Sequence, residues 1–295
     1  MTLPDDAADG SDGLDGVAAA TGDFSHLFNL RVGSGDVALN TGQVKAGQIL
    51  ISADAGSLTI GSTLDARAAR GGVVQLSARD ALTLANGGRI LANSTRAGAN
   101  GGDVLLSSST GRVTVAAGAA IDAGGDDDKD GRVVLRAERS GTTVKVDPIA
   151  GVIDAAEVSI EALRRYVGSS IKSGTTLGAA IGQSTLLADI TSFMANKSAI
   201  LTALGVATDP RFHLRPGVEV TSSADLTLTN DWNLYAASRP GGEPGFLTLR
   251  AAGNLFGGVF GRIGSASYEM QRAVGGKAHD DAFAAAVNEC KQYFK

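Results

Sequence analysis

The most densely charged segment of this 295-residue sequence is 126–131, Asp-Asp-Asp-Lys-Asp-Gly. Four of its residues stand at the first, third, fifth and sixth positions of a calcium-binding loop: Asp126, Asp128, Asp130 and Gly131. The twelfth position requires a bidentate glutamate but is Ala137, and Glu138 comes one residue late. No helical pattern flanks the segment. We therefore expect a solvated acidic turn, in which the three aspartates are weak calcium candidates, and no cofactor.

A second group of carboxylates recurs at one place in a repeated phrase. Asp65, Asp122 and Asp154 each stand between an aliphatic residue and an alanine in a short strand-like run. If equivalent strands stack about 4.8 Å apart, Asp122 and Asp154 are adjacent like charges, which destabilise each other unless a cation or solvent relieves them. Leu91 takes the equivalent place in between, and the outward neighbours supply no clear arginine or lysine base. We expect solvated aspartates beside turns, with no catalytic role.

Nucleophilic catalysis lacks its usual residues in this sequence. His26, His213 and His279 lie in three different segments, and no Gly-x-Ser-x-Gly motif occurs. Cys290 is the single cysteine, so an internal disulfide is excluded. Trp232 is expected to fill the core, and His213 is expected to be structural. No Walker or dinucleotide-binding glycine pattern is present, and we predict that the chain is not an enzyme.

Composition narrows the class of protein further. Glycine, at 40 residues, is about twice its average share, while aromatic residues make up only 5%. This balance is typical of many tight turns between short strands around a narrow aliphatic interior. The net charge of −5 argues against a nucleic-acid partner. No apolar run reaches about 18 residues, so no membrane-spanning helix is predicted.

The elements that carry these residues are predicted by a repeated phrase. Gly47-Gln-Ile-Leu-Ile-Ser-Ala53 recurs with variation at 72–78, 102–108 and 131–137. A second apolar run follows each copy, at 58–60, 82–84, 113–115 and 144–146, and a third follows at 64–66, 90–92, 121–123 and 153–155. Three short strands at a period of roughly 20–30 residues are the signature of a solenoid, in which stacked coils share one core.

Alternation of side chains along each strand assigns the faces. In the second run the aliphatic residues point inward and Thr59, Thr83 and Thr114 point to water. The repeated phrase itself is the first run of each coil. Its inward positions are aliphatic, and its outward positions are mostly aliphatic too: Leu50, Gln75, Leu105 and Val134. An apolar outer face predicts that another element covers it.

Residues 184–204 are the predicted cover. Their apolar side chains recur at helical spacing, and Gly205 stands where a helix C-terminus favours glycine. Our hypothesis is that this amphipathic segment interrupts the solenoid and packs against the outward face of the first runs. The strand pattern resumes afterwards, because Leu226-Thr-Leu228 repeats the phrase at Leu82-Thr-Leu84.

These patterns divide the chain into five segments. They are a disordered acidic segment (1–26), β-helix coils (27–157), a helical insertion (158–210), resumed coils (211–257) and a divergent helical tail (258–295). An extra coil is expected at the start, since Phe28 to Val32, Val37 to Leu39 and Val44 to Ala46 echo the order of the three runs.

The order of these phrases resembles the filamentous-haemagglutinin-like exoproteins of two-partner secretion systems in Gram-negative bacteria. The resemblance covers about 27–257 and is generic in the coils. It is more specific in three stretches: Arg211-Phe-His-Leu-Arg-Pro-Gly-Val-Glu-Val220, Asp225-Leu-Thr-Leu to Trp232, and Gly241-Gly-Glu-Pro-Gly to Leu255.

The resemblance implies a right-handed parallel β-helix that forms the shaft of a secreted or surface-exposed adhesin, at the cell surface or outer membrane. It also implies an outer-membrane barrel transporter as secretion partner, and receptors on host cells or other bacteria. The secretion domain and signal of that family do not occur in this sequence, and 258–295 do not continue its pattern. We therefore interpret the chain as an internal or truncated fragment of a longer exoprotein.

Two other functions remain open from the sequence. One is a β-helical enzyme that degrades polysaccharides, because β-helical polysaccharide lyases use carboxylates like Asp122 to hold calcium beside a basic residue. The other is part of a contact-dependent inhibition exoprotein, whose toxin would lie at the C-terminus.

Overall fold

The computed structural model describes residues 24–125, 131–172, 174–175, 177–230 and 242–257, together with the backbone of 268–270. It is mostly β, with long parallel sheets and two short helices, so the predicted all-β class is confirmed and the sheets are compatible with a solenoid. The described residues form two compact units. The first comprises 24–163 and Asn196–Arg215, and the second comprises Arg164–Ala195 and the described residues from Pro216 onward.

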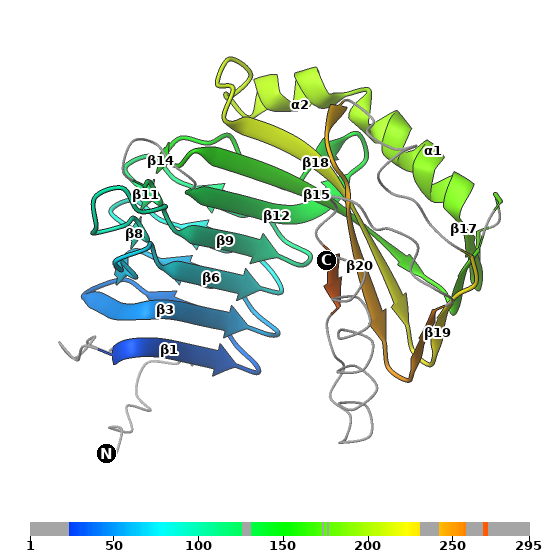
Figure 1. The fold of residues 1–295 in the computed structure, drawn as a ribbon, viewed down its shortest axis with the longest axis horizontal. Coiled ribbons are helices and arrows are strands. Elements are labelled where there is room, and N and C mark those ends of the chain that lie inside the picture. The colour runs from blue at the N-terminus through cyan, green and yellow to red at the C-terminus, as the bar shows by residue number, and fades with distance from the viewer. Residues whose placement is uncertain are drawn as a thin grey trace. The chain divides into compact units, whose positions relative to one another are not determined.

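The first-run strands of the first unit form one parallel sheet, seen as successive rungs in Figure 1. They are β1 (Phe24–Val32), β3 (Gln43–Ala53), β6 (Val73–Ala78), β9 (Asp103–Ser108), β12 (Arg132–Ser140) and β15 (Glu157–Val167), of which 157–163 belong to this unit. Each strand pairs with its equivalent in the next coil, so that Ile49 faces Val74 and Val74 faces Val104. The repeated phrase therefore corresponds to one rung of the stack.

The second and third runs build two further parallel columns. The second-run strands are β2 (Val37–Leu39), β4 (Leu58–Ile60), β7 (Leu82–Leu84) and β10 (Val113–Val115). The third-run strands are β5 (Thr63–Asp65), β8 (Arg89–Leu91), β11 (Ala120–Asp122) and β14 (Val152–Asp154), with the start of β3 as the first member. The predicted extra coil is confirmed, because Phe28, Val37 and Val44 pair with Ile49, Leu58 and Leu64.

The core is the inward aliphatic stack that the alternation predicts. Its largest fully buried side chains come from all three runs: Ile49, Ile51, Leu58, Ile60, Leu64, Leu76, Leu82, Leu84, Ile90, Leu106, Ile121 and Leu135. Burying one such side chain contributes about 1.5–3 kcal/mol, and it does so only when the neighbouring coils are present.

Glycine at the start of the repeated phrase is required by the corner between the third and first runs. A Cβ on Gly72 would overlap the carbonyl oxygen of Ala66, and one on Gly102 would overlap that of Ala92. Gly131 stands in the same relation to the carbonyl of Ala123. The chain therefore turns where only a residue without a side chain fits.

One predicted register is wrong. The sequence pairs Val144 with Val113, but the structure brings Val146 to Val113 by a single parallel bridge. The cause is that β12 extends to Ser140 and folds back on β13 (Thr143–Val144) as an antiparallel pair, with Gly141 at φ +59° in the turn. This hairpin takes up Val144, the first residue of the predicted second run, so the pairing with Val113 begins two residues later.

The predicted helical segment is present as two helices, but three of the four outward first-run positions that were predicted to be covered are not buried. Helices α1 (Gln183–Met194) and α2 (Lys197–Ala203) form, and Gly205 follows with φ +77°. Leu50 and Leu105 nevertheless remain partly exposed and Gln75 is exposed, whereas Val134 is buried. In the first unit the chain after α2 lies at the end of the stack instead, where the amide of Ile149 donates to the carbonyl of Leu204.

The helical insertion is also shorter than predicted. Strands β15, β16 (Ser170–Lys172) and β17 (Ala180–Gly182) occupy most of 157–182, a segment that the sequence assigned to helix from residue 158. Within the second unit, α1 follows β17 directly, and β16 pairs in parallel with β17 and with β19 (Leu226–Leu228).

The resumed strands after the helices agree with the sequence. They are β18 (Phe212–Ser222), β19, β20 (Phe246–Ala251) and β21 (Leu255–Gly257). β18 pairs in parallel with β20, and β19 with β21. The prediction of a helical tail over 258–295 is wrong for its described part, which is the strand β22 (Tyr268–Met270). The expected helix near the C-terminus lies outside the described residues.

Candidate functional site

The third-run column brings the predicted aspartates into one line. Asp65 pairs with Leu91, Leu91 with Asp122, and Asp122 with Asp154. The expectation that Asp122 and Asp154 are direct neighbours is therefore confirmed. Lys45 precedes Asp65 in the same line, at the start of the column.

Asp65 is held by a complete set of donors. Its side chain is 2% exposed, and Arg67 donates from Nε to Oδ1 at 2.9 Å and from Nη2 to Oδ2 at 2.7 Å. The amide of Arg67 reaches Oδ1 at 3.1 Å, and Gln43 Nε2 reaches Oδ2 at 3.1 Å. The hydrogen bonds from the Arg67 side chain lower the pKa of Asp65, against an opposing effect of burial. Sequence reasoning missed Arg67, although the Asp-x-Arg spacing was a usable signal.

Asp122 has the opposite environment. Its carboxylate accepts one hydrogen bond, from the amide of Gly124 to Oδ1 at 3.2 Å. Burial raises the pKa of Asp122, and the neighbouring charge of Asp154 raises it further. A carboxyl with a raised pKa that lies beside a second carboxyl group is an arrangement that can exchange a proton with a bound molecule. Among the described residues of this column, Asp122 is therefore the candidate for proton-transfer chemistry.

The Asp-x-Arg contact occurs a second time, at the end of the column. Arg211 donates from its amide and Nε to Asp209 Oδ1 at 3.0 and 3.1 Å, and from Nη2 to Oδ2 at 2.7 Å. These bonds lower the pKa of Asp209. Arg211 Nη1 also reaches the carbonyls of Ile153 and Ala155, at 3.2 and 3.4 Å. Since β14 is the last strand of its sheet, Arg211 satisfies acceptors on an edge that would otherwise pair with another chain.

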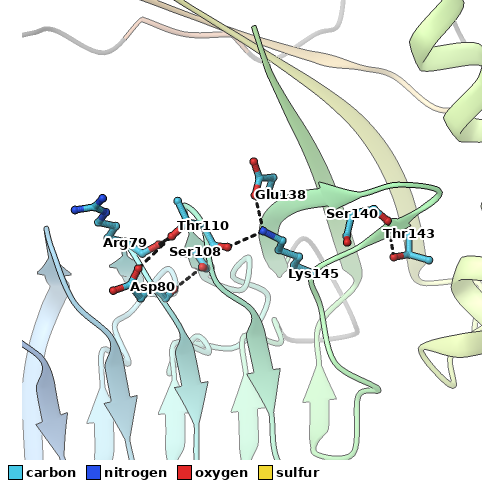
Figure 2. A network of polar contacts seen from close by, with 8 residues as sticks. All are labelled: Arg79, Asp80, Ser108, Thr110, Glu138, Ser140, Thr143 and Lys145. Atoms are coloured by element: carbon cyan, nitrogen blue, oxygen red, sulfur yellow. Dashed lines mark hydrogen bonds and ion pairs between the residues drawn. The ribbon is translucent and has the colours of Figure 1, made fainter. Parts of the chain in front are cut away.

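A second polar cluster links three coils at the corner between the first and second runs, as Figure 2 shows. Thr110 Oγ1 donates to the carbonyl of Arg79 at 2.8 Å, and Ser108 Oγ donates to the carbonyl of Asp80 at 2.5 Å. Lys145 Nζ then bridges the carbonyl of Thr110, at 2.8 Å, and Glu138 Oε2, at 2.6 Å. Thr110 Oγ1 also lies 3.1 Å from Asp80 Oδ1. Because each hydroxyl contacts a backbone carbonyl of the preceding coil, the cluster ties successive coils together.

The adjoining corner continues this pattern. Asp147 accepts from Arg112 Nε and from Thr114 Oγ1, the latter at 2.6 Å. Burial raises the pKa of Asp147, but the hydrogen bonds from Thr114 and Arg112 together outweigh it, so the pKa of this carboxyl is lowered. Polar contacts between coils therefore recur where the aliphatic stack ends.

The remaining predicted residues do not converge on a site. His26 is exposed on β1, and His213 is half-buried on β18. The calcium candidates Asp126, Asp128 and Asp130, together with Trp232, His279 and Cys290, lie outside the described residues. Among the described residues, no group of three or more histidine, cysteine, aspartate or glutamate side chains is placed to hold a metal ion. No helix there is long and apolar enough to cross a bilayer.

Comparison with known proteins returned no match: no family model, no curated protein and no solved structure is similar to this chain.

Proposed function

We propose that this chain is shaft material of a secreted or surface-exposed bacterial adhesin of the filamentous haemagglutinin type. In this proposal the parallel columns form a right-handed β-helix, and the shaft holds recognition regions away from the cell for attachment to host cells or other bacteria. A right-handed path is supported by the strong general preference of parallel crossover connections for that hand. The sequence resemblance supplies the biological role.

The observation that carries the proposal is the in-register stack of equivalent strands. The first-run strands pair residue for residue from β3 to β15, and the second and third runs pair in the same order. Each coil offers its backbone groups and its aliphatic face to the next, so length can grow without a new core. The polar cluster at the corner between the first and second runs is consistent with this role, because Ser108, Thr110 and Lys145 connect neighbouring coils.

The test is a surface and adherence assay in the bacterium that carries the gene. Antibodies against the described coils should label intact cells, and deletion of the gene should reduce attachment to host cells or to other bacteria. Deletion of an adjacent barrel-transporter gene should remove the surface label while leaving the protein detectable in lysed cells. Labelling that requires lysis of wild-type cells, or unchanged attachment after deletion, would overturn the proposal.

A β-helical polysaccharide-degrading enzyme is the second candidate, and Asp122 is the observation that favours it. Its carboxyl combines a raised pKa with a neighbouring carboxylate, Asp154, as an acid-base pair requires. Depolymerisation of acidic polysaccharides by the purified chain, abolished by Asp122→Asn and retained in Asp65→Asn, would establish this function. Absence of depolymerisation across a panel of such polymers would exclude it.

A further inference from the structure

A hollow of about 530 Å³ lies over the connections that lead from the third run to the first. It is lined by Arg70 from one coil and by 96–100 from the next. These connections span 66–72 and 92–102 between the strands they join. The hollow is therefore built by two successive coils and depends on their stacking.

The walls of the hollow are held by the backbone. Ser94 pairs with Ala68 across the coils, and the amide of Thr95 donates to the carbonyl of Ala68 at 2.9 Å. Ser94 Oγ lies 3.4 Å from the carbonyl of Arg96 and 3.3 Å from that of Ala99, closing the longer loop on itself.

The two loops also meet through glycine. Gly71 has φ +74°, and a Cβ there would overlap the backbone of Gly101. Gly98, at φ +71°, allows the tight turn between Arg96 and Ala99, whose amide donates to the Arg96 carbonyl at 3.2 Å. The arginines thus project from a loop pair with a defined backbone.

Charge is unbalanced around this hollow. Arg70 and Arg96 make no ion pair and no side-chain hydrogen bond among the described residues, and both are exposed. The nearest carboxylates of the same connections are already engaged, because Asp65 is paired with Arg67 and Asp103 with Arg132. No acidic residue belongs to the described lining. Two arginines therefore line one hollow, and no carboxylate is among its described lining residues.

We propose that this hollow binds a phosphomonoester on a small sugar. Guanidinium groups bind phosphate oxygens through paired, charge-assisted hydrogen bonds, and two of them balance the dianion. The volume falls within the range of small-molecule sites and exceeds the needs of a bare anion, which leaves room for the sugar. The site is independent of the adhesin role, since it requires only that these two coils stack.

Calorimetric titration of the whole chain with glucose 6-phosphate tests the proposal. We expect a Kd of about 1 mM or below, with weaker binding of inorganic phosphate and none of glucose. Arg70→Gln and Arg96→Gln should each weaken binding by about tenfold. Binding should also tighten between pH 5 and pH 7.5, as the phosphate loses its second proton at a pKa of about 6.

Arg79→Gln and Arg89→Gln are the matched controls. Both arginines are exposed on neighbouring parts of the same coils, make no ion pair among the described residues and lie outside the hollow. Each control should leave the affinity unchanged within about twofold. Equal weakening by the controls would mean nonspecific attraction and would overturn the proposal. So would an affinity for inorganic phosphate as high as that for the sugar phosphate, or no binding by the unmodified chain.

Discussion

Asp65 and Asp122 occupy equivalent positions in the third-run column, two coils apart, and their environments are opposite. Asp65 is almost fully buried and receives four hydrogen bonds, and its pKa is lowered. Asp122 receives one hydrogen bond and lies beside Asp154, and its pKa is raised. The same backbone position therefore carries a stabilised charge in one coil and a destabilised charge in the other.

The difference lies two residues further along the chain. Arg67 follows Asp65 in the one coil, and Gly124 follows Asp122 in the other. Stacking fixes where each aspartate points, while the residue at the second position after it decides whether its charge is neutralised within its own coil. Asp209 and Arg211 repeat the first solution outside the repeat, which indicates that the Asp-x-Arg contact is a local motif.

The largest effect should come from breaking the register on which this comparison rests. Gly102→Ala places a Cβ on the carbonyl of Ala92, so the corner must open and the strands that follow must shift. We expect a loss of about 3 kcal/mol in the free energy of unfolding, measured by urea denaturation. Gly61→Ala is the control, because its nearest contact would be an ordinary 3.4 Å to the Cα of Asn40. Equal losses in both variants would contradict the role assigned to the corner.

Removing the partner of Asp65 should have the next largest effect. Arg67→Ala leaves a buried carboxylate with only Gln43 and one backbone amide as donors, so we expect a loss of about 2 kcal/mol at neutral pH. Arg31→Ala removes an exposed pair with Asp54 and should cost about 0.5 kcal/mol or less. The loss in Arg67→Ala should shrink as Asp65 becomes protonated at acid pH. A loss that does not depend on pH would show that packing of the arginine, and not its charge, is responsible.

The sequence was sufficient to predict the stack and the adjacency of Asp122 and Asp154, but not the partners that set the charge state of each carboxyl group. Inward positions such as Leu82 and Ile90 follow from alternation, because every coil must fill the same narrow interior. The Arg67 contact lies between outward side chains at a turn, where alternation carries no information. The shifted Val146 depends on a hairpin that competes with the stack. The hydrogen bond from Arg211 to the carbonyl of Ile153 joins residues 58 positions apart, and no local pattern encodes such a contact.

Transplanting the arginine should sharpen the comparison. Gly124→Arg recreates the Asp-x-Arg spacing after Asp122, and a Cβ on Gly124 would lie an ordinary 3.6 Å from Asp122 Oδ1 and from Asp154 Oδ2. We expect a lowered pKa of Asp122, measured by NMR titration, and a gain of about 1 kcal/mol in the free energy of unfolding. Gly124→Ala should give neither change in the pKa nor a comparable gain. An unchanged pKa of Asp122 in Gly124→Arg would show that the motif requires more than spacing.

The smallest and most specific effect is the pH dependence of the contribution that each aspartate makes to the free energy of unfolding. Because the pKa of Asp122 is raised in the folded state, the folded protein keeps this proton after the unfolded chain has lost it, so stability falls as pH rises from the ordinary aspartate pKa through the raised value. For Asp65, whose pKa is lowered, the contribution to stability is present above the ordinary aspartate pKa and is lost as pH falls through the lowered value.

Two variants test these signs. Relative to the unmodified chain, the free energy of unfolding of Asp122→Asn should therefore increase by about 0.5 kcal/mol between pH 3 and pH 7, and that of Asp65→Asn should decrease over the same range. Urea denaturation of the three proteins at both pH values measures the two slopes. Slopes of the same sign would mean that position in the column, and not the residue two places on, sets the charge state of these carboxylates.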